Sequence, residues 1–357
     1  MKWPVHGSNP QYIYEALNLP MPHQTIDFST NINPLGPPSN LKEKWAELLP
    51  LITDYPDPHA LSMTKSLAEK EGVIPSQLLI GNGGAEIISL IGRLLAGKRA
   101  LIIQPAFAEY EEACRVNGCA VEYFQLQANE WKLNEDELAS KLAQMDALFI
   151  TNPQNPTGVY FAREQIIHLL QACCDNDCYL IVDEAFYDFV STYEPIVALI
   201  NEYPRLLIVR SMTKMFAIAG LRLGYLIANA RIIQELKSYQ PHWSINAIAL
   251  KAGEWCLDEE EFIEKTRTLI DEERAKLFSF YQQNDFNVSP SQTNFYLLQD
   301  GLKDDQRPLF QFLLEKGMIP RHTMNFRGCE GNWLRFAIKS PKENRQLMEA
   351  MAEWRGN

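Results

Sequence analysis

The chain has 357 residues, 46% hydrophobic and 22% charged, with a net charge of −12. Single hydrophobic cores rarely grow beyond about 250–300 residues, so we expect two lobes. The acidic balance argues against nucleic acid or an anionic membrane surface as a partner.

The first 40 residues are rich in proline and asparagine, and their weak periodicity predicts an extended N-terminal arm. The N-terminal sequence lacks the apolar stretch of a signal peptide, and no apolar run is long enough to span a bilayer. We therefore expect a soluble protein of the cytoplasm with no membrane partner.

Short β-branched runs alternate with amphipathic stretches from about residue 78 to residue 228. We expect strands over 78–80, 100–103, 121–124, 147–151, 179–182, 206–209 and 223–228. Helices are expected over 87–95, 109–117, 134–142 and 163–175. This alternation predicts an α/β fold with a doubly wound, mostly parallel sheet. In such sheets, ligands bind beyond the carboxyl ends of the strands.

The pattern changes after residue 228, where long helical segments over 245–257 and 259–283 come first. A shorter α/β segment follows, with strands over 294–298 and 333–338 and helices over 307–316 and 341–355. We therefore predict an arm over residues 1–40, a large domain over 41–240 and a small C-terminal domain over 241–357.

The seven cysteines form an odd, scattered set, which fits reduced thiols better than a disulfide framework. Cys173, Cys174 and Cys178 have a spacing like that of metal ligands. They lie in or beside an apolar helical run with no matching His/Cys pair nearby, so we predict core packing and no metal.

The most informative stretch is Ser211-Met212-Thr213-Lys214, followed eight residues later by Arg222, because it comes directly after a predicted strand. A lysine amine condenses with an aldehyde to a Schiff base, while a hydroxyl and a guanidinium bind phosphate. The pattern is therefore what a phosphorylated aldehyde cofactor requires. Taken alone, Ser-x-x-Lys also occurs in serine hydrolases, and the lysine alone is also typical of a solvated surface.

Two more polar residues follow predicted strands. Asp183, read alone, is a helix cap or a structural ion-pair partner. Together with Lys214, it would pair with a pyridinium nitrogen and keep the ring protonated. Asn155 lies between Pro153 and Pro156, which fix a tight loop. Its amide is available to a ring oxygen, and the alternative is an ordinary turn.

The turn from Gly81 to Glu86 links a strand to a helix and is rich in glycine, so its backbone amides predict an anion site. It matches neither the dinucleotide fingerprint nor a P-loop, so we discount nucleotide binding. Phe107 follows another strand and either stacks on a planar ring or belongs to the core.

Together these motifs resemble fold-type I pyridoxal-phosphate enzymes, in the branch with histidinol-phosphate aminotransferase and threonine-phosphate decarboxylase. The resemblance implies pyridoxal 5'-phosphate bound to Lys214, with Asp183 at the pyridine nitrogen. It further implies Asn155 at the ring hydroxyl and Phe107 on the ring face. The cofactor phosphate would be held by Gly84, Ala85, Ser211 and Arg222.

Tyr55 resembles the tyrosine that this branch sends across a dimer interface to the cofactor phosphate. The resemblance therefore also implies a homodimer with a shared active site. Arg321 and Arg335 match the arginines that bind the carboxylate and phosphate ends of a phosphorylated amino-acid substrate, for which their planar forks are suited.

Two features favour the decarboxylase. His6 and Gly7, together with Asn31, resemble the substrate-contacting arm of threonine-phosphate decarboxylases. The usual arm reads His-Gly-Gly-Asn, and Ser8 departs from it. The aminotransferases usually carry a tyrosine three residues after the strand-end aspartate, where this chain has Phe186. The neighbouring Tyr187 should not substitute, because successive residues of an extended segment point to opposite faces.

The sequence therefore predicts decarboxylation of O-phospho-L-threonine to 1-aminopropan-2-ol phosphate and carbon dioxide, with a place in cobalamin biosynthesis implied by the resemblance. The alternative is a histidinol-phosphate-type aminotransferase that uses 2-oxoglutarate. A more remote alternative, a non-catalytic regulator that binds the cofactor, is disfavoured by the intact Lys214 and Asp183 and by the lack of a basic patch.

Overall fold

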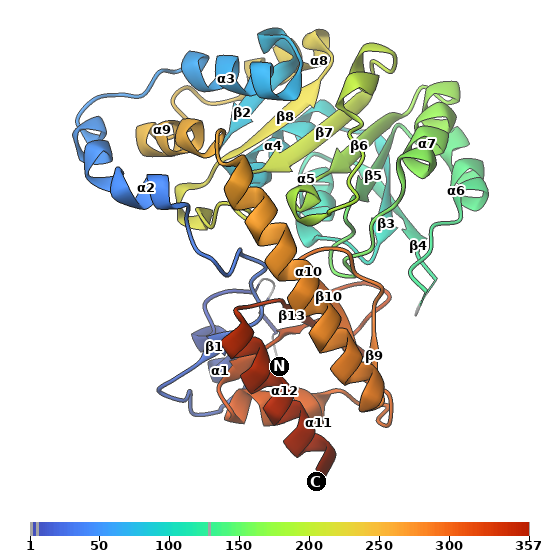
Figure 1. Cartoon of the computed structure of the whole chain (residues 1–357). Coiled ribbons are helices and arrows are strands. Elements are labelled where there is room, and N and C mark those ends of the chain that lie inside the picture. The colour runs from blue at the N-terminus through green and yellow to red at the C-terminus, as the bar shows by residue number, and fades with distance from the viewer. Residues whose placement is uncertain (1–2, 5–6, 128–129, 357) are drawn as a thin grey trace.

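The computed structural model describes residues 3–4, 7–127 and 130–356, which form a large lobe and a small lobe (Figure 1). Both chain ends lie in the small lobe, and the long helix α10 (Glu260–Gln283) runs from one lobe to the other. Among the described residues, no helix has the length and apolar character needed to cross a membrane.

The large lobe is built on a seven-stranded sheet in the order β2-β8-β7-β6-β5-β3-β4. Only β8 runs against its neighbours β2 and β7, so the predicted mostly parallel sheet is confirmed. The strands are β2 (Leu78–Gly81), β3 (Arg99–Gln104), β4 (Ala120–Gln125), β5 (Ala147–Thr151), β6 (Tyr179–Asp183), β7 (Leu206–Ser211) and β8 (Gly224–Ala228).

Successive residues of the central strands face opposite sides of the sheet, and both sides are buried. In β5, for example, Leu148 and Ile150 join one apolar cluster, whereas Ala147 and Phe149 join the other. The helices that pack around the sheet are α3 (Leu61–Glu71), α4 (Gly83–Leu94), α5 (Ala108–Val116), α6 (Glu135–Lys141), α7 (Arg163–Asp175) and α8 (Ala230–Tyr239). The sequence predicted α4 to α7 but not α3 or α8.

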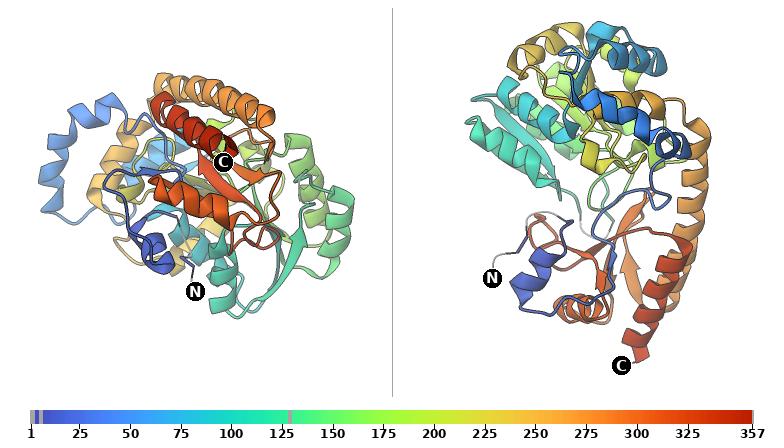
Figure 2. Two further views of the ribbon diagram at one scale, coloured as in Figure 1. Left: turned by 90° about the horizontal axis from the view of Figure 1, so that it is seen from below. Right: turned by 90° about the vertical axis from the view of Figure 1, so that its left-hand side faces the viewer.

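The small lobe contains a four-stranded antiparallel sheet in the order β12-β13-β10-β9 (Figure 2). Helices α11 (Arg307–Glu315) and α12 (Pro341–Gly356) belong to the same lobe. The strands are β9 (Phe286–Val288), β10 (Phe295–Asp300), β12 (Arg321–His322) and β13 (Leu334–Ala337).

The N-terminal arm is not extended throughout, because Gln11–Leu17 form helix α1. Ile13 and Tyr14 are buried, and the Tyr14 hydroxyl donates to the carbonyl of Leu314 at 2.7 Å. A helix of two turns is too short to give a clear periodic pattern, so contacts with the small lobe must stabilise it. Further along, β1 (Ile26–Asp27) pairs in parallel with β11 (Met318–Ile319).

The segment between the arm and α3 holds two short helices that the sequence did not indicate, α2 (Ser39–Glu43) and η1 (Trp45–Ile52). Helix α9 (Ala247–Cys256) packs against η1 and α3. The division into residues 1–40, 41–240 and 241–357 remains a prediction.

Cys173 and Cys178 are buried in the core of the large lobe, as predicted, but Cys174 is exposed. Cys173 and Cys174 are adjacent in α7 and therefore point to different sides of the helix. Cys173 faces the sheet, so core packing is confirmed for Cys173 and Cys178 and wrong for Cys174.

Candidate active site

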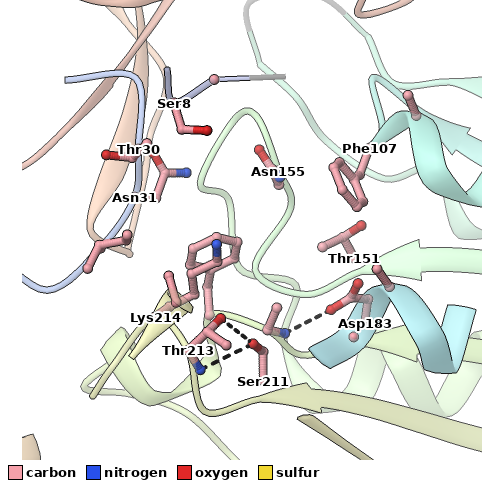
Figure 3. A pocket seen from close by; sticks show the side chains of 18 of the residues that line it. Ser8, Thr30, Asn31, Phe107, Thr151, Asn155, Asp183, Ser211, Thr213 and Lys214 are labelled. Atoms are coloured by element: carbon pink, nitrogen blue, oxygen red, sulfur yellow. Dashed lines mark hydrogen bonds between the residues drawn. The ribbon is translucent and has the colours of Figure 1, made fainter. Parts of the chain in front are cut away.

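A cavity of about 430 Å³ lies at the carboxyl ends of β5, β6 and β7 (Figure 3). Two groups of residues line it. One, here called the sheet wall, comes from the large lobe and contains Gly84, Ala85, Phe107, Asp183, Ser211, Lys214 and Arg222. The other, here called the arm wall, comes from the arm and the small lobe and contains Gly7, Ser8, Asn31, Arg321 and Arg335.

Lys214 follows the end of β7, as the sequence predicted, and belongs to the sheet wall (Figure 3). Its carbonyl accepts a hydrogen bond from the backbone N–H of Asn33 at 3.1 Å, which ties the lysine turn to the arm. Burial, and then the charges of Arg335 and Arg222, lower the pKa of Lys214 to about 8, although Asp183 opposes the shift. The neutral amine is therefore a larger fraction near neutral pH than it is for an ordinary lysine, although it is still the minor form.

Asp183 is the last residue of β6, and both its carboxylate oxygens accept hydrogen bonds. The hydroxyl of Tyr110 donates to Oδ2 at 2.6 Å, and the backbone N–H of Ala185 donates to Oδ1 at 2.9 Å. Burial raises the pKa of Asp183, while Tyr110, Ala185 and Lys214 act in the opposite direction. Tyr110 was not predicted, although it lies only three residues after Phe107.

Glu184, next to Asp183, has a different position. Its carboxylate accepts from Arg210 Nε at 2.9 Å and from the Tyr193 hydroxyl at 3.0 Å. The Tyr187 ring lies 3.9 Å from the Arg210 guanidinium carbon. Glu184 is therefore held in a buried ion pair with Arg210. Of the two consecutive carboxylates, it is that of Asp183 that faces the cavity.

The predicted anion site lies at the N-terminus of α4. Gly84 and Ala85 are in the first turn of this helix, and Ser211 and Arg222 line the same part of the cavity. Gly83 has a φ of 74°, and a Cβ there would lie 2.6 Å from Nη2 of Arg222. Glycine is therefore required for the guanidinium to approach the helix start, where backbone N–H groups favour an anion.

Phe107 and Phe186 are two of the aromatic residues that line the cavity. Phe107 comes just before α5, and its ring centroid lies 5.9 Å from that of Tyr110. Phe186 is buried, with its ring edge-to-face against Phe295 at 4.8 Å. A phenylalanine at position 186 offers a flat apolar surface and no hydroxyl.

Asn155 connects the two walls. Its Oδ1 accepts from Nη1 of Arg335 at 2.7 Å, while Nη2 of Arg335 donates to the carbonyl of Ser29 at 2.7 Å. Since the oxygen of the amide is used by Arg335, the amide nitrogen is the group that can donate to a ring oxygen.

The arm wall presents two buried guanidinium groups to the same cavity. Burial lowers the pKa of Arg321 to about 9 and that of Arg335 to about 10, and the charge of Arg335 contributes to the shift at Arg321. Within the described residues, Nε of Arg335 and Oδ1 of Asn31 are buried without a hydrogen-bond partner. An anionic ligand would relieve the repulsion and satisfy the guanidinium donor.

The arm reaches the cavity through Gly7 and Ser8. A Cβ on Gly7 would lie 2.7 Å from the carbonyl oxygen of Ser29, so the arm packs too closely there for any larger residue. Ser8 has a φ of 69°, in the region that favours glycine, which explains why a glycine would fit this position. The predicted substrate contact His6 lies outside the described residues.

Tyr55 does not line the cavity. Its side chain is 85% exposed, and its ring lies 5.3 Å from that of Trp243. A residue this exposed is not placed in the site of its own chain, and the predicted contact across a dimer interface stays a prediction.

The residues of the sheet wall fit pyridoxal phosphate. A buried amine of lowered pKa suits an aldehyde, and the helix N-terminus with Ser211 and Arg222 suits a phosphate. The orientation of Asp183 and the ring of Phe107 suit a pyridine nitrogen and a planar face.

The family model described as "Aminotransferase class I and II" matches residues 23–351 of the chain. Threonine-phosphate decarboxylase of Salmonella typhimurium is 33% identical over 97% of this chain and 95% of its own length. The adenosylcobalamin biosynthesis bifunctional protein CobDQ of Leptospira interrogans is 30% identical over 99% of this chain and 41% of its own. The crystal structure of histidinol-phosphate aminotransferase from Clostridium acetobutylicum superposes with a TM-score of 0.87 at 32% identity, covering 92% of this chain and 99% of the other.

The chain belongs to the aminotransferase class I and II family. This membership confirms the predicted fold type, the predicted class of enzyme and pyridoxal phosphate as the cofactor. Relatives of both predicted activities are similar over most of the chain, so the overall fold does not distinguish decarboxylation from transamination.

Proposed function

We propose that the protein decarboxylates O-phospho-L-threonine to 1-aminopropan-2-ol phosphate and carbon dioxide. The observation that carries the proposal is Phe186, which packs against Phe295 in the cavity wall and leaves no hydroxyl where the aminotransferases usually have one. The arm supports it, because Gly7 and Asn31 line the same cavity as Lys214.

The sheet wall holds the cofactor in this proposal. Lys214 binds its aldehyde carbon, and Asp183 pairs with the ring nitrogen. Phe107 covers one ring face, and the amide nitrogen of Asn155 donates to the ring oxygen. Its phosphate is bound by Gly84, Ala85, Ser211 and Arg222. When bound there, the cofactor would supply an electron sink for the breaking of a bond at the substrate's Cα.

The arm wall orients the substrate. Arg335 and Arg321 bind the two anionic ends of a phosphorylated amino acid, and the gap between them sets how far apart those ends lie. Since Arg335 is fixed by Asn155 and Ser29, the anion that it binds has a fixed position relative to the sheet wall. Decarboxylation would require that the two arginines hold the substrate so that the Cα–carboxylate bond, rather than Cα–H, is the one positioned to break. Lys214 is then the amine that can return a proton to Cα.

The functional unit in this proposal is a homodimer with a shared active site. Tyr55 is exposed beside Trp243, and the neighbouring Leu49, Ile52 and Leu61 are exposed as well. A surface of this kind, continuous along one segment, is typical of an interface. We propose that Tyr55 reaches the cofactor phosphate of the partner subunit. The similarity to CobDQ supports a place in cobalamin biosynthesis.

The deciding experiment consists of two parallel assays of the purified holoenzyme. In the first, the enzyme is incubated with phosphothreonine and carbon dioxide is measured. In the second, it is incubated with histidinol phosphate and 2-oxoglutarate and glutamate is measured. We expect carbon dioxide with phosphothreonine and no glutamate. Glutamate without carbon dioxide would establish the aminotransferase, the activity named for the similar structure from Clostridium acetobutylicum. Absence of both products, with the cofactor bound, would contradict both proposals. As a matched control, Lys214→Ala should form neither product.

A further inference from the structure

Tyr110 lines the cavity beside Asp183, and the proposed function assigns it no role. It lies in the first turn of α5 and is buried. Its ring stacks on Phe149 of β5 at 5.6 Å and meets Phe107 edge-on at 5.9 Å. Contacts on two sides leave the ring little freedom to turn, so its hydroxyl has a fixed direction.

That hydroxyl joins the ends of two adjacent strands. Thr151 is the last residue of β5 and Asp183 the last of β6, and the two are paired in register. The Tyr110 hydroxyl lies 2.6 Å from Oδ2 of Asp183 and 3.1 Å from Oγ1 of Thr151. A phenol has one proton. If that proton goes to the carboxylate, the Thr151 hydroxyl donates to the phenol oxygen, which gives a chain from Thr151 through Tyr110 to Asp183.

The protonation states support this direction. Burial and the neighbouring Asp183 raise the pKa of Tyr110 well above its ordinary value, so the phenol remains a donor. The hydrogen bond that it gives lowers the pKa of Asp183, against the effect of burial. The other titratable group acting on Asp183 is Lys214, whose charge also lowers that pKa.

We propose that Tyr110, supported by Thr151, is a positioning residue that fixes the Asp183 carboxylate toward the ring nitrogen of the cofactor and limits its basicity. With Oδ1 held by Ala185 and Oδ2 held by Tyr110, the carboxylate has one orientation. A carboxylate of limited basicity leaves the proton on the ring nitrogen, where it makes the ring a stronger electron acceptor. This inference rests on the role proposed above for Asp183.

The test compares Tyr110→Phe with the wild-type holoenzyme and with Tyr281→Phe. Tyr281 is a matched control, since it is also buried and its hydroxyl bonds one other hydroxyl, that of Tyr296 at 2.7 Å, away from the cavity. Two quantities are measured besides turnover. One is the dissociation constant of pyridoxal phosphate, and the other is the pH midpoint of the near-visible band of the bound cofactor.

We expect Tyr110→Phe to weaken cofactor binding roughly tenfold. This is the low end of the loss in affinity that follows when a residue that orients a binding side chain is removed. The pH midpoint should rise by about half a unit or more. Without Tyr110, the more basic Asp183 draws the proton away from the ring nitrogen, and a less positive ring lets the nitrogen linked to Lys214 keep its own proton to higher pH. Thr151→Val should move both quantities in the same direction by less. Thr151→Ser, which restores a hydroxyl, and Tyr281→Phe should match the wild type.

Asp183→Asn separates this inference from the proposed function. If Asp183→Asn shifts the pH midpoint but Tyr110→Phe and Thr151→Val leave it within about 0.1 unit of wild type, the positioning role is wrong and the role of Asp183 stands. If Asp183→Asn also leaves the midpoint unchanged, Asp183 does not pair with the ring and both proposals are wrong. Should Tyr110→Phe fail to fold, Thr151→Val alone decides the question.

Discussion

The two walls of the cavity differ in how their polar groups are satisfied. In the sheet wall, Asp183 has partners for both oxygens, and Ser211 is bonded to Thr213 at 2.7 Å. In the arm wall, two guanidinium groups repel each other, and Nε of Arg335 has no partner within the described residues. The carboxylate of the first wall is therefore preorganised, whereas the second wall keeps a guanidinium donor that an anionic ligand would satisfy.

This difference predicts different effects of substitution. Changes in the sheet wall should alter the bound cofactor and its spectrum. Changes in the arm wall that keep its charge should alter the use of substrate and leave the spectrum as it is.

Lys214→Ala should lower turnover roughly a thousandfold or more, since the amine both binds the cofactor and carries a proton. In the wild type, borohydride reduction should bleach the near-visible band and leave a mass label on Lys214, as peptide mass spectrometry can show. A label on a different lysine would contradict the assignment. Lys251, an exposed lysine paired with Glu254, provides a control position where alanine should have no effect.

Arg335→Lys and Arg321→Lys should each lower kcat/KM by roughly ten- to a hundredfold, because an ammonium keeps the charge but loses the planar fork. The expected loss is that of one charge-assisted hydrogen bond, about 1.5–3 kcal/mol. Steady-state kinetics with phosphothreonine measures it, and absorbance spectra show whether the cofactor is unchanged. A changed spectrum with unchanged kcat/KM would show that these arginines act on the cofactor rather than on the substrate.

Tyr55 should act on the site of the partner subunit. A mixture of Tyr55→Phe and Lys214→Ala protomers forms heterodimers with one intact site and one site carrying both changes. Since one of the two sites of each heterodimer is intact, the activity per heterodimer should recover to as much as about half of the wild-type value. Confirmed subunit exchange without any recovery would show that Tyr55 acts within its own chain or not at all.

The rate at which the apoenzyme captures pyridoxal phosphate should rise with pH through about 8, the pKa of Lys214. The lowered pKa means that the neutral, reactive amine is the minor form below this pH and the major form above it. From pH 7 to pH 8 its fraction rises roughly fivefold. Stopped-flow absorbance measures this rate.

Arg335→Met should shift the capture profile to higher pH, because the charge of Arg335 helps to lower the pKa of Lys214. Arg335→Lys retains the charge and should leave the profile in place. Identical profiles for all three proteins would mean that the arm wall has no electrostatic influence on the sheet wall.

The sheet wall was largely predictable from the sequence, because its residues follow strands of a parallel sheet and such strands end at one edge. Asp183 and Lys214 could thus be placed near each other although they are 31 positions apart. Tyr110 was missed because nothing in its local pattern shows which strand end its hydroxyl meets.

The arm was harder to predict. Helix α1 is stabilised by contacts with residues about 300 positions away, such as the bond from Tyr14 to Leu314, and a local pattern does not record such contacts. The same limit applies to Asn155, whose oxygen is used by Arg335, 180 positions along the chain. Asn155 and Arg335 could be assigned to the site from motifs, but not their bond to each other.

Asn33 holds the arm to two other parts of the molecule, the turn after β7 and helix α10. Its backbone N–H donates to Lys214, and its side-chain amide donates to the carbonyl of Met215 at 2.7 Å and to Thr266 of α10 at 2.8 Å. Seven positions earlier, the arm is paired with the small lobe through β1. The small lobe also bonds the carbonyls of Phe28 and Ser29, through the backbone N–H of Ala337 and the side chain of Arg335. Along this segment, a movement of one lobe against the other would therefore be absorbed between Ser29 and Asn33. Asn31 lies in that short stretch, so closing of the lobes and placement of this proposed substrate contact would be a single mechanical event.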